Sequence, residues 1–201
     1  MIAKGEFGID YLEKAISSIT ESTIGQESEQ DFDGLWEDMD LKSSKLGKMV
    51  SEKSKLIAKI LNTINTIDFH LENMELDVLG DAYEYLIGMF AQTAGKKGGE
   101  FYTPVNMSKL VARLATVGLT EAKTVSDCAC GSGGLLLQVG KYCKVGQYFG
   151  QELTSTTYNL ARMNMLLHGI DYKKFEILNV DTLEKDQNPD RQYTCLLYTS
   201  D

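Results

Sequence analysis

The stretch DCACGSGG, residues 127–134, decides the fold of this chain. It follows KTVSD (123–127), which predicts a short strand, and it leads into GLLLQVGKY (134–142), whose apolar run predicts a helix. A strand, a glycine loop and a helix in this order form a ligand site at the carboxyl edge of a parallel sheet. Glycines let a ligand lie close to the backbone, and the first N–H groups of a helix lack partners within it. The stretch therefore predicts a small-molecule site.

The glycine spacing favours a nucleoside-type cofactor over two related kinds of loop. The dinucleotide motif G-x-G-x-x-G, begun at Gly131, requires a glycine where Leu136 stands. A phosphate loop of the form G-x-x-x-x-G-K-[ST] requires a lysine that does not follow here. Zinc sites need paired Cys-x-x-Cys motifs or nearby histidines, whereas Cys128 and Cys130 are separated by one residue and the two histidines lie elsewhere. We expect four free thiols and no metal site.

Strands and helices alternate from residue 105 onward. Apolar spacing predicts helices over 105–118, 134–142 and 154–169, and strands over 123–127, 146–152, 175–181 and 193–199. Such alternation is typical of an α/β fold with a doubly wound, mostly parallel sheet. In the first of these helices, we expect Leu110, Val111, Leu114 and Val117 to face inward.

The preceding part of the chain is predicted to be helical over 9–20, 41–68 and 76–91. The polar, acidic segment 21–34 is predicted to be a mobile loop. The glycine-rich and lysine-containing AGKKGGE (94–100) is predicted to be a flexible crossing or a lid. We therefore expect two parts: a helical N-terminal region, 1–93, and the cofactor-binding part of an α/β domain, 94–201.

The charge of the chain is placed unevenly. The net charge is −9, and residues 1–40 carry all of it, because the remaining residues hold eighteen acidic and eighteen basic side chains. Neither part has the basic surplus of a surface that holds a nucleic-acid backbone unaided. If DNA is the substrate, another component must supply most of the grip. The sequence shows no apolar run of about 18 residues and no signal-peptide pattern, so we expect a cytoplasmic protein without membrane contact.

Three consecutive predicted strands each end in an acidic residue, namely Asp127, Glu152 and Asp181. A carboxylate at the second strand end can accept two hydrogen bonds from a ribose diol, as the acid of the dinucleotide fold does. Each acid taken singly is as consistent with capping the following helix as with binding a ligand. Together they suit a ligand that carries an ammonium group, a sulfonium group and ribose hydroxyls.

GGEFYTP (98–104), DCACGSGG and GQE (150–152), in this order, resemble the cofactor motifs of a known family. This is the modification subunit of type I restriction-modification systems, an adenine-N6 DNA methyltransferase of the gamma arrangement. LGDAYEYLIGMFA (79–91) and ARMNMLLHGI (161–170) extend the similarity over nearly the whole chain. The resemblance implies a Rossmann-like, S-adenosylmethionine-dependent methyltransferase domain. It also implies three partners: DNA, a specificity subunit and a restriction subunit.

The resemblance also implies which residues bind S-adenosylmethionine. Phe101 and Tyr102 would form an apolar wall at the methionine and sulfonium end, Glu152 would hold the ribose diol, and Asp181 would face the adenine. The full implied set is Glu100, Phe101, Tyr102, Thr103, Pro104, Val105, Asp127, Gly131, Ser132, Gly133, Gly134, Glu152 and Asp181. Cys128 stands where the family usually has proline, a small steric change that should not abolish binding.

The larger departure from the family is the missing catalytic motif. Adenine-N6 methyltransferases carry Asn-Pro-Pro-Tyr/Phe after the fourth strand, where its oxygens accept the hydrogens of the target amine and its ring stacks the extruded base. No such motif follows 193–199, and Asn188-Pro189-Asp190 lacks the second proline and the aromatic residue. We expect a subunit truncated at both ends and inactive alone. A non-catalytic module that binds S-adenosylmethionine, or a nicotinamide oxidoreductase, would be the alternatives.

Overall fold

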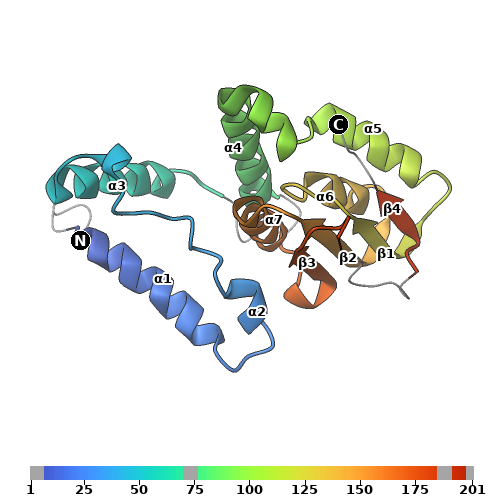
Figure 1. Cartoon of the computed structure of the whole chain (residues 1–201), viewed down its shortest axis with the longest axis horizontal. Helices are drawn as coiled ribbons and strands as arrows, with labels where there is room; N and C mark the ends of the chain where they lie inside the picture. The colour runs from blue at the N-terminus through green and yellow to red at the C-terminus, as the bar shows by residue number, and fades with distance from the viewer. Residues whose placement is uncertain (1–6, 70–76, 185–191, 198–201) are drawn as a thin grey trace. The chain divides into compact units, whose positions relative to one another are not determined.

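The computed structural model describes residues 7–69, 77–184 and 192–197, in two compact units. The units are Met1–Met74 and Glu75–Asp201, which run from blue to teal and from green to red in Figure 1. The Asn188-Pro189-Asp190 segment lies outside the described residues, as does the end of the strand predicted over 193–199. No helix in the described ranges is both long enough and apolar enough to cross a membrane.

The first unit is built from helices, in agreement with the sequence. It contains α1 (Ile9–Thr23), α2 (Glu29–Phe32), a 3-10 turn (Ser44–Leu46) and α3 (Val50–Asn65). The helix predicted over 41–68 begins only at Val50, because Gly47 has φ +141° and interrupts the helical path. Glu52 then accepts the N–H groups of Met49 at 3.1 Å and Lys48 at 2.8 Å, which lowers the pKa of its carboxyl and closes the first turn. The loop predicted over 21–34 contains the end of α1 and all of α2.

The second unit contains a four-stranded parallel sheet, which confirms the predicted α/β class. Its strands are β1 (Glu121–Asp127), β2 (Lys144–Glu152), β3 (Phe175–Asn179) and β4 (Cys195–Leu197), in the order β3-β2-β1-β4. Asp127 pairs with Gly150 of β2 and with Leu197 of β4, so the carboxyl ends of these strands lie at one edge. The chain order reverses at β1, the position beside which ligands bind in open α/β sheets.

Two helices pack on this sheet, and two more pack on those helices. The inner pair, α6 (Gly134–Gly140) and α7 (Ser155–Leu167), contacts the strands, while α5 (Val105–Ala115) packs on α6 and α4 (Val78–Ala94) packs on α7 (Figure 1). α7 has Thr154 as its N-cap and ends just before Gly169, which has φ +68°, so it agrees with the helix predicted over 154–169. The side chains at the centre are fully buried: Val125, Leu136, Val139, Ala161 and Met165.

The inward face predicted for α5 is wrong at three of its four residues; Val111 is partly buried and packs against the core as predicted. Leu110, Leu114 and Val117 are 52%, 66% and 75% exposed, whereas Ser108 and Ala112 are buried at 3% and 0%. Small side chains let the backbones of α5 and α6 approach closely, and the larger apolar residues of α5 fall on the neighbouring stripe of the helix. Apolarity alone therefore selected the wrong stripe.

The segment predicted to be a flexible crossing or a lid is a 3-10 helix, Gly95–Glu100, packed on the end of α4. A Cβ on Gly98 would lie 2.1 Å from the carbonyl oxygen of Ala91, so only glycine permits this approach. The N–H of Tyr102 donates to the Gly98 carbonyl at 3.1 Å and continues the turn. α4 belongs to the second compact unit. The boundary predicted at 93/94 for the family domain stays a prediction.

Candidate functional site

The glycine loop and the EFYTP segment, which are far apart in sequence, lie against each other. Gly131 has φ +55°, and a Cβ there would lie 2.8 Å from the carbonyl oxygen of Phe101. The N–H of Ser132 donates to that same oxygen at 3.0 Å. Two backbones can approach this closely only because position 131 has no side chain and can adopt a left-handed conformation. The glycine is therefore required by the neighbouring chain segment as well as by any ligand.

A hollow of about 390 Å³, open to solvent, lies between these two segments. Most of the residues predicted to bind the cofactor line it: Glu100, Phe101, Tyr102, Thr103, Asp127, Gly131, Ser132 and Gly134. Gly99, Ala129, Cys130 and Leu135 line it as well and were not predicted. Each of these four lies within two residues of a predicted one, so the motifs identify the right segments but not every lining residue.

Asp127 is the most deeply buried acid of the hollow. Its side chain follows directly from the end of β1 and is only 1% exposed. Burial raises the pKa of this carboxyl to about 6; the N–H of Ala129, which donates to Oδ1 at 3.0 Å, acts in the opposite direction, and the negative charge of Glu152 adds to the rise. Among the described residues only Oδ1 is engaged, so Oδ2 remains for a ligand. A positively charged ligand would favour the ionised form.

Glu152 holds two loops together at the end of β2. Its Oε2 accepts the N–H of Gly131 at 3.1 Å, and its Oε1 accepts the N–H of Thr154 at 2.8 Å. The side chain is buried at 9% exposure and does not line the hollow itself. Both the glycine loop and the start of α7 are thus positioned by one carboxylate. Charge-assisted bonds of this kind are among the stronger hydrogen bonds of a protein.

Four other predicted residues lie outside the lining. β3 ends at Asn179, so Asp181 follows in a turn, where its Oδ1 accepts the N–H of Leu183 at 2.8 Å. Pro104 is the N-cap of α5, and Val105, its first residue, lines a neighbouring groove. Gly133 is buried at the N-cap of α6 with φ +79°. The predicted strand end at Asp181 was two residues too late.

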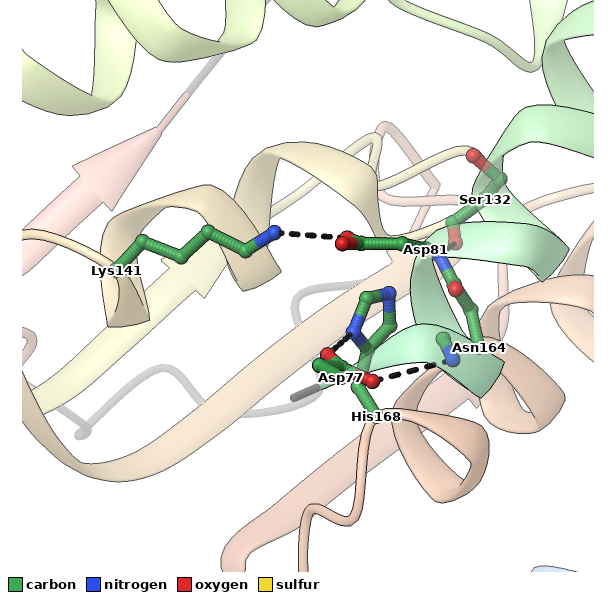
Figure 2. A network of polar contacts seen from close by, with 7 residues as sticks. Asp77, Asp81, Ser132, Lys141, Asn164 and His168 are labelled. Atoms are coloured by element: carbon green, nitrogen blue, oxygen red, sulfur yellow. Dashed lines mark hydrogen bonds and ion pairs between the residues drawn. The ribbon is translucent and has the colours of Figure 1, made fainter. Parts of the chain in front are cut away.

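Two residues that the sequence analysis missed hold the glycine loop from outside. Asn164 of α7 is fully buried, and its Nδ2 donates to the carbonyl oxygen of Ser132 at 2.9 Å; Figure 2 shows the two side by side. Thr182 donates its hydroxyl to the carbonyl oxygen of Cys128 at 2.6 Å. The signal for Asn164 was available: it lies between Ala161 and Met165 on the apolar stripe of a helix, where a polar residue must find a partner.

The cysteines of the loop behave as buried thiols. Cys130 is buried, and desolvation together with the charges of Asp127 and Glu152 raises the pKa of its thiol well above the usual range. Burial also raises the pKa of the Cys128 thiol. All four cysteines are free, as expected. Within the described ranges, no group of three His, Cys, Asp or Glu side chains is arranged to hold a metal ion.

The chain is similar to methylase subunits of type I restriction enzymes. It is 46% identical over 162 residues to the MpnII methylase subunit of Mycoplasma pneumoniae, a match that covers 78% of this chain and 30% of that relative. It is 35% identical over 136 residues to the MjaVIII methylase subunit of Methanocaldococcus jannaschii, covering 66% of this chain and 23% of the relative. The chain therefore spans less than a third of either relative.

A solved structure agrees with these matches. The methyltransferase subunit of a type I restriction-modification system from Streptococcus thermophilus resembles this structure with a TM-score of 0.81 at 38% identity, covering 95% of this chain and 40% of that one. Residues 74–197 match the family described as N-6 DNA Methylase, and this range includes the glycine loop, the EFYTP segment and the four-stranded sheet. The family resemblance seen in the sequence motifs is confirmed, and the chain belongs to the N-6 DNA methylase family.

Proposed function

We propose that the protein is part of the modification subunit of a type I restriction-modification system, a site-specific adenine-N6 DNA methyltransferase that uses S-adenosylmethionine. One observation carries this proposal: the EFYTP segment and the DCACGSGG loop enclose a single hollow at the carboxyl edge of the sheet. Both segments belong to the range that matches the family. DNA, a specificity subunit and a restriction subunit are the proposed partners.

The residues around the hollow fit the chemistry of S-adenosylmethionine. The cofactor carries positive charge on its sulfonium and ammonium groups, and the buried Asp127 carboxyl lines the hollow with Oδ2 unengaged by the described residues. Phe101 and Tyr102 supply apolar surface for the methionine end, and Thr103 supplies a hydroxyl. Glu152, just behind the loop, would accept the ribose hydroxyls. Asp181 would face the adenine, because only its Oδ1 is used by the turn after β3.

When bound, S-adenosylmethionine supplies an electrophilic methyl group. The residues of this chain would hold that group in line with the target nitrogen and exclude water, and orientation of this kind accounts for a large part of enzymatic acceleration. The Asn-Pro-Pro-aromatic motif that would accept the hydrogens of the adenine amine is not among the 201 residues. We therefore expect the purified chain to bind the cofactor without methylating DNA. Transfer of a labelled methyl group to unmodified DNA by this chain would contradict that expectation.

The charge distribution agrees with a division of labour between subunits. Outside the first forty residues the acidic and basic side chains balance, so this part of the chain has no surplus of positive charge for the phosphate backbone. Selection of the DNA sequence and most of the grip on DNA would come from the specificity subunit. The alternative function, a non-catalytic module that binds S-adenosylmethionine for assembly, shares the same hollow and differs only in lacking methyl transfer.

Isothermal titration with S-adenosylmethionine and with NADH tests the cofactor. We expect heat of binding with S-adenosylmethionine and none with NADH. Binding of NADH but not of S-adenosylmethionine would overturn the proposal. Asp181→Ala should weaken binding about tenfold or more, since it removes a charged hydrogen-bond acceptor. Asp171→Ala is the matched control, because Asp171 accepts the N–H of Lys173 at 2.9 Å in the same kind of turn at the opposite end of β3. Equal effects of the two variants would remove Asp181 from the site.

A further inference from the structure

A second hollow, a groove of about 750 Å³, adjoins the candidate cofactor site between α4, α5 and α6. Tyr102 lines both hollows and forms the wall between them. Its hydroxyl packs against α4, where a Cβ on Gly88 would lie 2.9 Å from it. Val105, which the family resemblance includes among the cofactor-binding residues, lines this groove. The segment that contains Tyr102 and Val105 thus faces both hollows.

Two hydrogen-bond acceptors in the groove lack partners. Gln138 of α6 is 2% exposed, and its Oε1 has no hydrogen-bond partner among the described residues. Glu84 of α4 is half-buried and likewise has neither a hydrogen bond nor an ion pair to any described residue. Its Oε1 lies 3.2 Å from the position that a Cβ on Gly134 would occupy, and Gly134 lines the cofactor hollow. Leaving such acceptors unpaired is costly unless a ligand supplies donors.

The charged residues near Glu84 form ion pairs with one another. Lys141 pairs with Asp81 at 3.2 Å, and His168 contacts Asp77, as Figure 2 shows. Burial raises the pKa of the Glu84 carboxyl; the positive charges of His168 and Lys141 oppose the rise, and the negative charges of Asp81 and Asp77 add to it. The net result is a raised pKa, caused mainly by burial. Lys109 of α5 is a further cation on the groove wall.

We propose that Glu84 and Gln138 bind the α-ammonium group at the amino-acid end of S-adenosylmethionine. An ammonium group carries a positive charge and three N–H donors. It could therefore form an ion pair with the Glu84 carboxylate and donate a hydrogen bond to the Gln138 amide oxygen. The amino-acid end of the cofactor would extend from the hollow, alongside Tyr102, into the groove. The carboxylate of the cofactor would then lie toward Lys109. Neither Glu84 nor Gln138 belongs to the three motifs that define the cofactor site. The inference rests on the proposed function, since it names the subsite for part of that cofactor.

The test compares two ligands that differ in the amino-acid end. 5′-Methylthioadenosine keeps the nucleoside and the sulfur, the latter as an uncharged thioether, but lacks the ammonium and carboxylate groups. In calorimetric titrations of the 201-residue chain, Glu84→Gln should weaken S-adenosylmethionine about 10- to 100-fold and leave 5′-methylthioadenosine within about twofold. Asp81→Asn is the control on the same helix: it removes an equal charge that is already paired with Lys141, and it should leave both affinities nearly unchanged.

Gln138→Met separates binding from folding. A residue needed only for the fold would lower the urea midpoint when replaced, but this substitution removes a buried acceptor that has no partner. We expect an unchanged or higher midpoint together with weaker binding of S-adenosylmethionine. If Glu84→Gln affects both ligands equally or affects neither, the ammonium subsite is wrong and the proposed cofactor stands. If neither ligand binds the unaltered chain, the proposed function itself fails and the subsite with it.

Discussion

Asp127→Asn should stabilise the ligand-free chain at neutral pH, and the size of the effect follows from the burial of this carboxyl. The pKa of the Asp127 carboxyl is about 6 in the folded chain and 3.8 when unperturbed. Between pH 3.8 and about pH 6, this carboxyl therefore keeps a proton in the folded chain that it has released in the unfolded chain. The free energy of unfolding therefore falls as the pH rises through this window. At about 1.4 kcal/mol for each tenfold change in proton affinity, the loss is roughly 3 kcal/mol.

Asparagine removes this loss without removing the local hydrogen bond. Its Oδ1 can still accept the N–H of Ala129, which donates to Asp127 at 3.0 Å, and the side chain cannot ionise. The stability of the variant minus that of the parent should be close to zero near pH 4 and approach about 3 kcal/mol above pH 7. Urea unfolding at pH 4, 5.5 and 7.5, without cofactor, measures the difference directly. The same variant should bind S-adenosylmethionine less tightly, a usual trade-off at binding sites.

A matched control isolates the burial of Asp127. Asp171 is exposed, and its Oδ1 accepts the N–H of a residue two positions further on, as that of Asp127 does. Asp171→Asn should therefore give no gain of stability at neutral pH, because this side chain is exposed and its carboxylate carries no cost of burial. A flat difference for Asp127→Asn over the same pH range, or a loss of stability at neutral pH, would refute the argument from desolvation.

Two further predictions concern the backbone of the glycine loop. Gly131→Ala should destabilise the chain by more than Gly169→Ala: both positions have positive φ, which costs about 1–2 kcal/mol for alanine, but only at Gly131 would the new Cβ lie 2.8 Å from a carbonyl oxygen, that of Phe101. Equal losses in urea unfolding would show that the loop can move away. Asn164→Leu should cost about 1–3 kcal/mol, because the buried Ser132 carbonyl loses its donor. An unchanged urea midpoint would mean that another group replaces Asn164.

The sheet and the loop could be predicted from sequence because their signals are local. The short strand 123–127 leads directly into DCACGSGG, whose glycines stand where the backbone needs left-handed conformations at Gly131 and Gly133. The strand-end positions of Asp127 and Glu152 follow from the same pattern. These features depend on the chain's own periodicity and backbone conformation, which a sequence displays directly.

The features that could not be predicted depend on tertiary partners. Ser108 and Ala112 of α5 are buried because α5 packs closely on α6. The sequence of α5 by itself does not indicate which of its faces makes this contact. The 3-10 helix Gly95–Glu100 is ordered by its contact with Ala91, although its composition is typical of a mobile loop. The strand predicted to end at Asp181 was two residues too long, because strand ends depend on pairing and β3 stops pairing at Asn179. Each of these predictions failed because a packing or pairing contact outweighed the local preference of the sequence.

Glu152 serves the fold, and its proposed role in binding a ribose is compatible with that service. Each of its oxygens accepts one backbone N–H, from Gly131 and from Thr154, and each carboxylate oxygen can accept about two hydrogen bonds. The remaining capacity equals the two donors of a ribose diol. A sugar bound there would leave the loop where it already lies, so its binding energy would not be spent on ordering residues 131–134. The glycine loop is therefore built before the cofactor arrives, by the same carboxylate that is proposed to receive it.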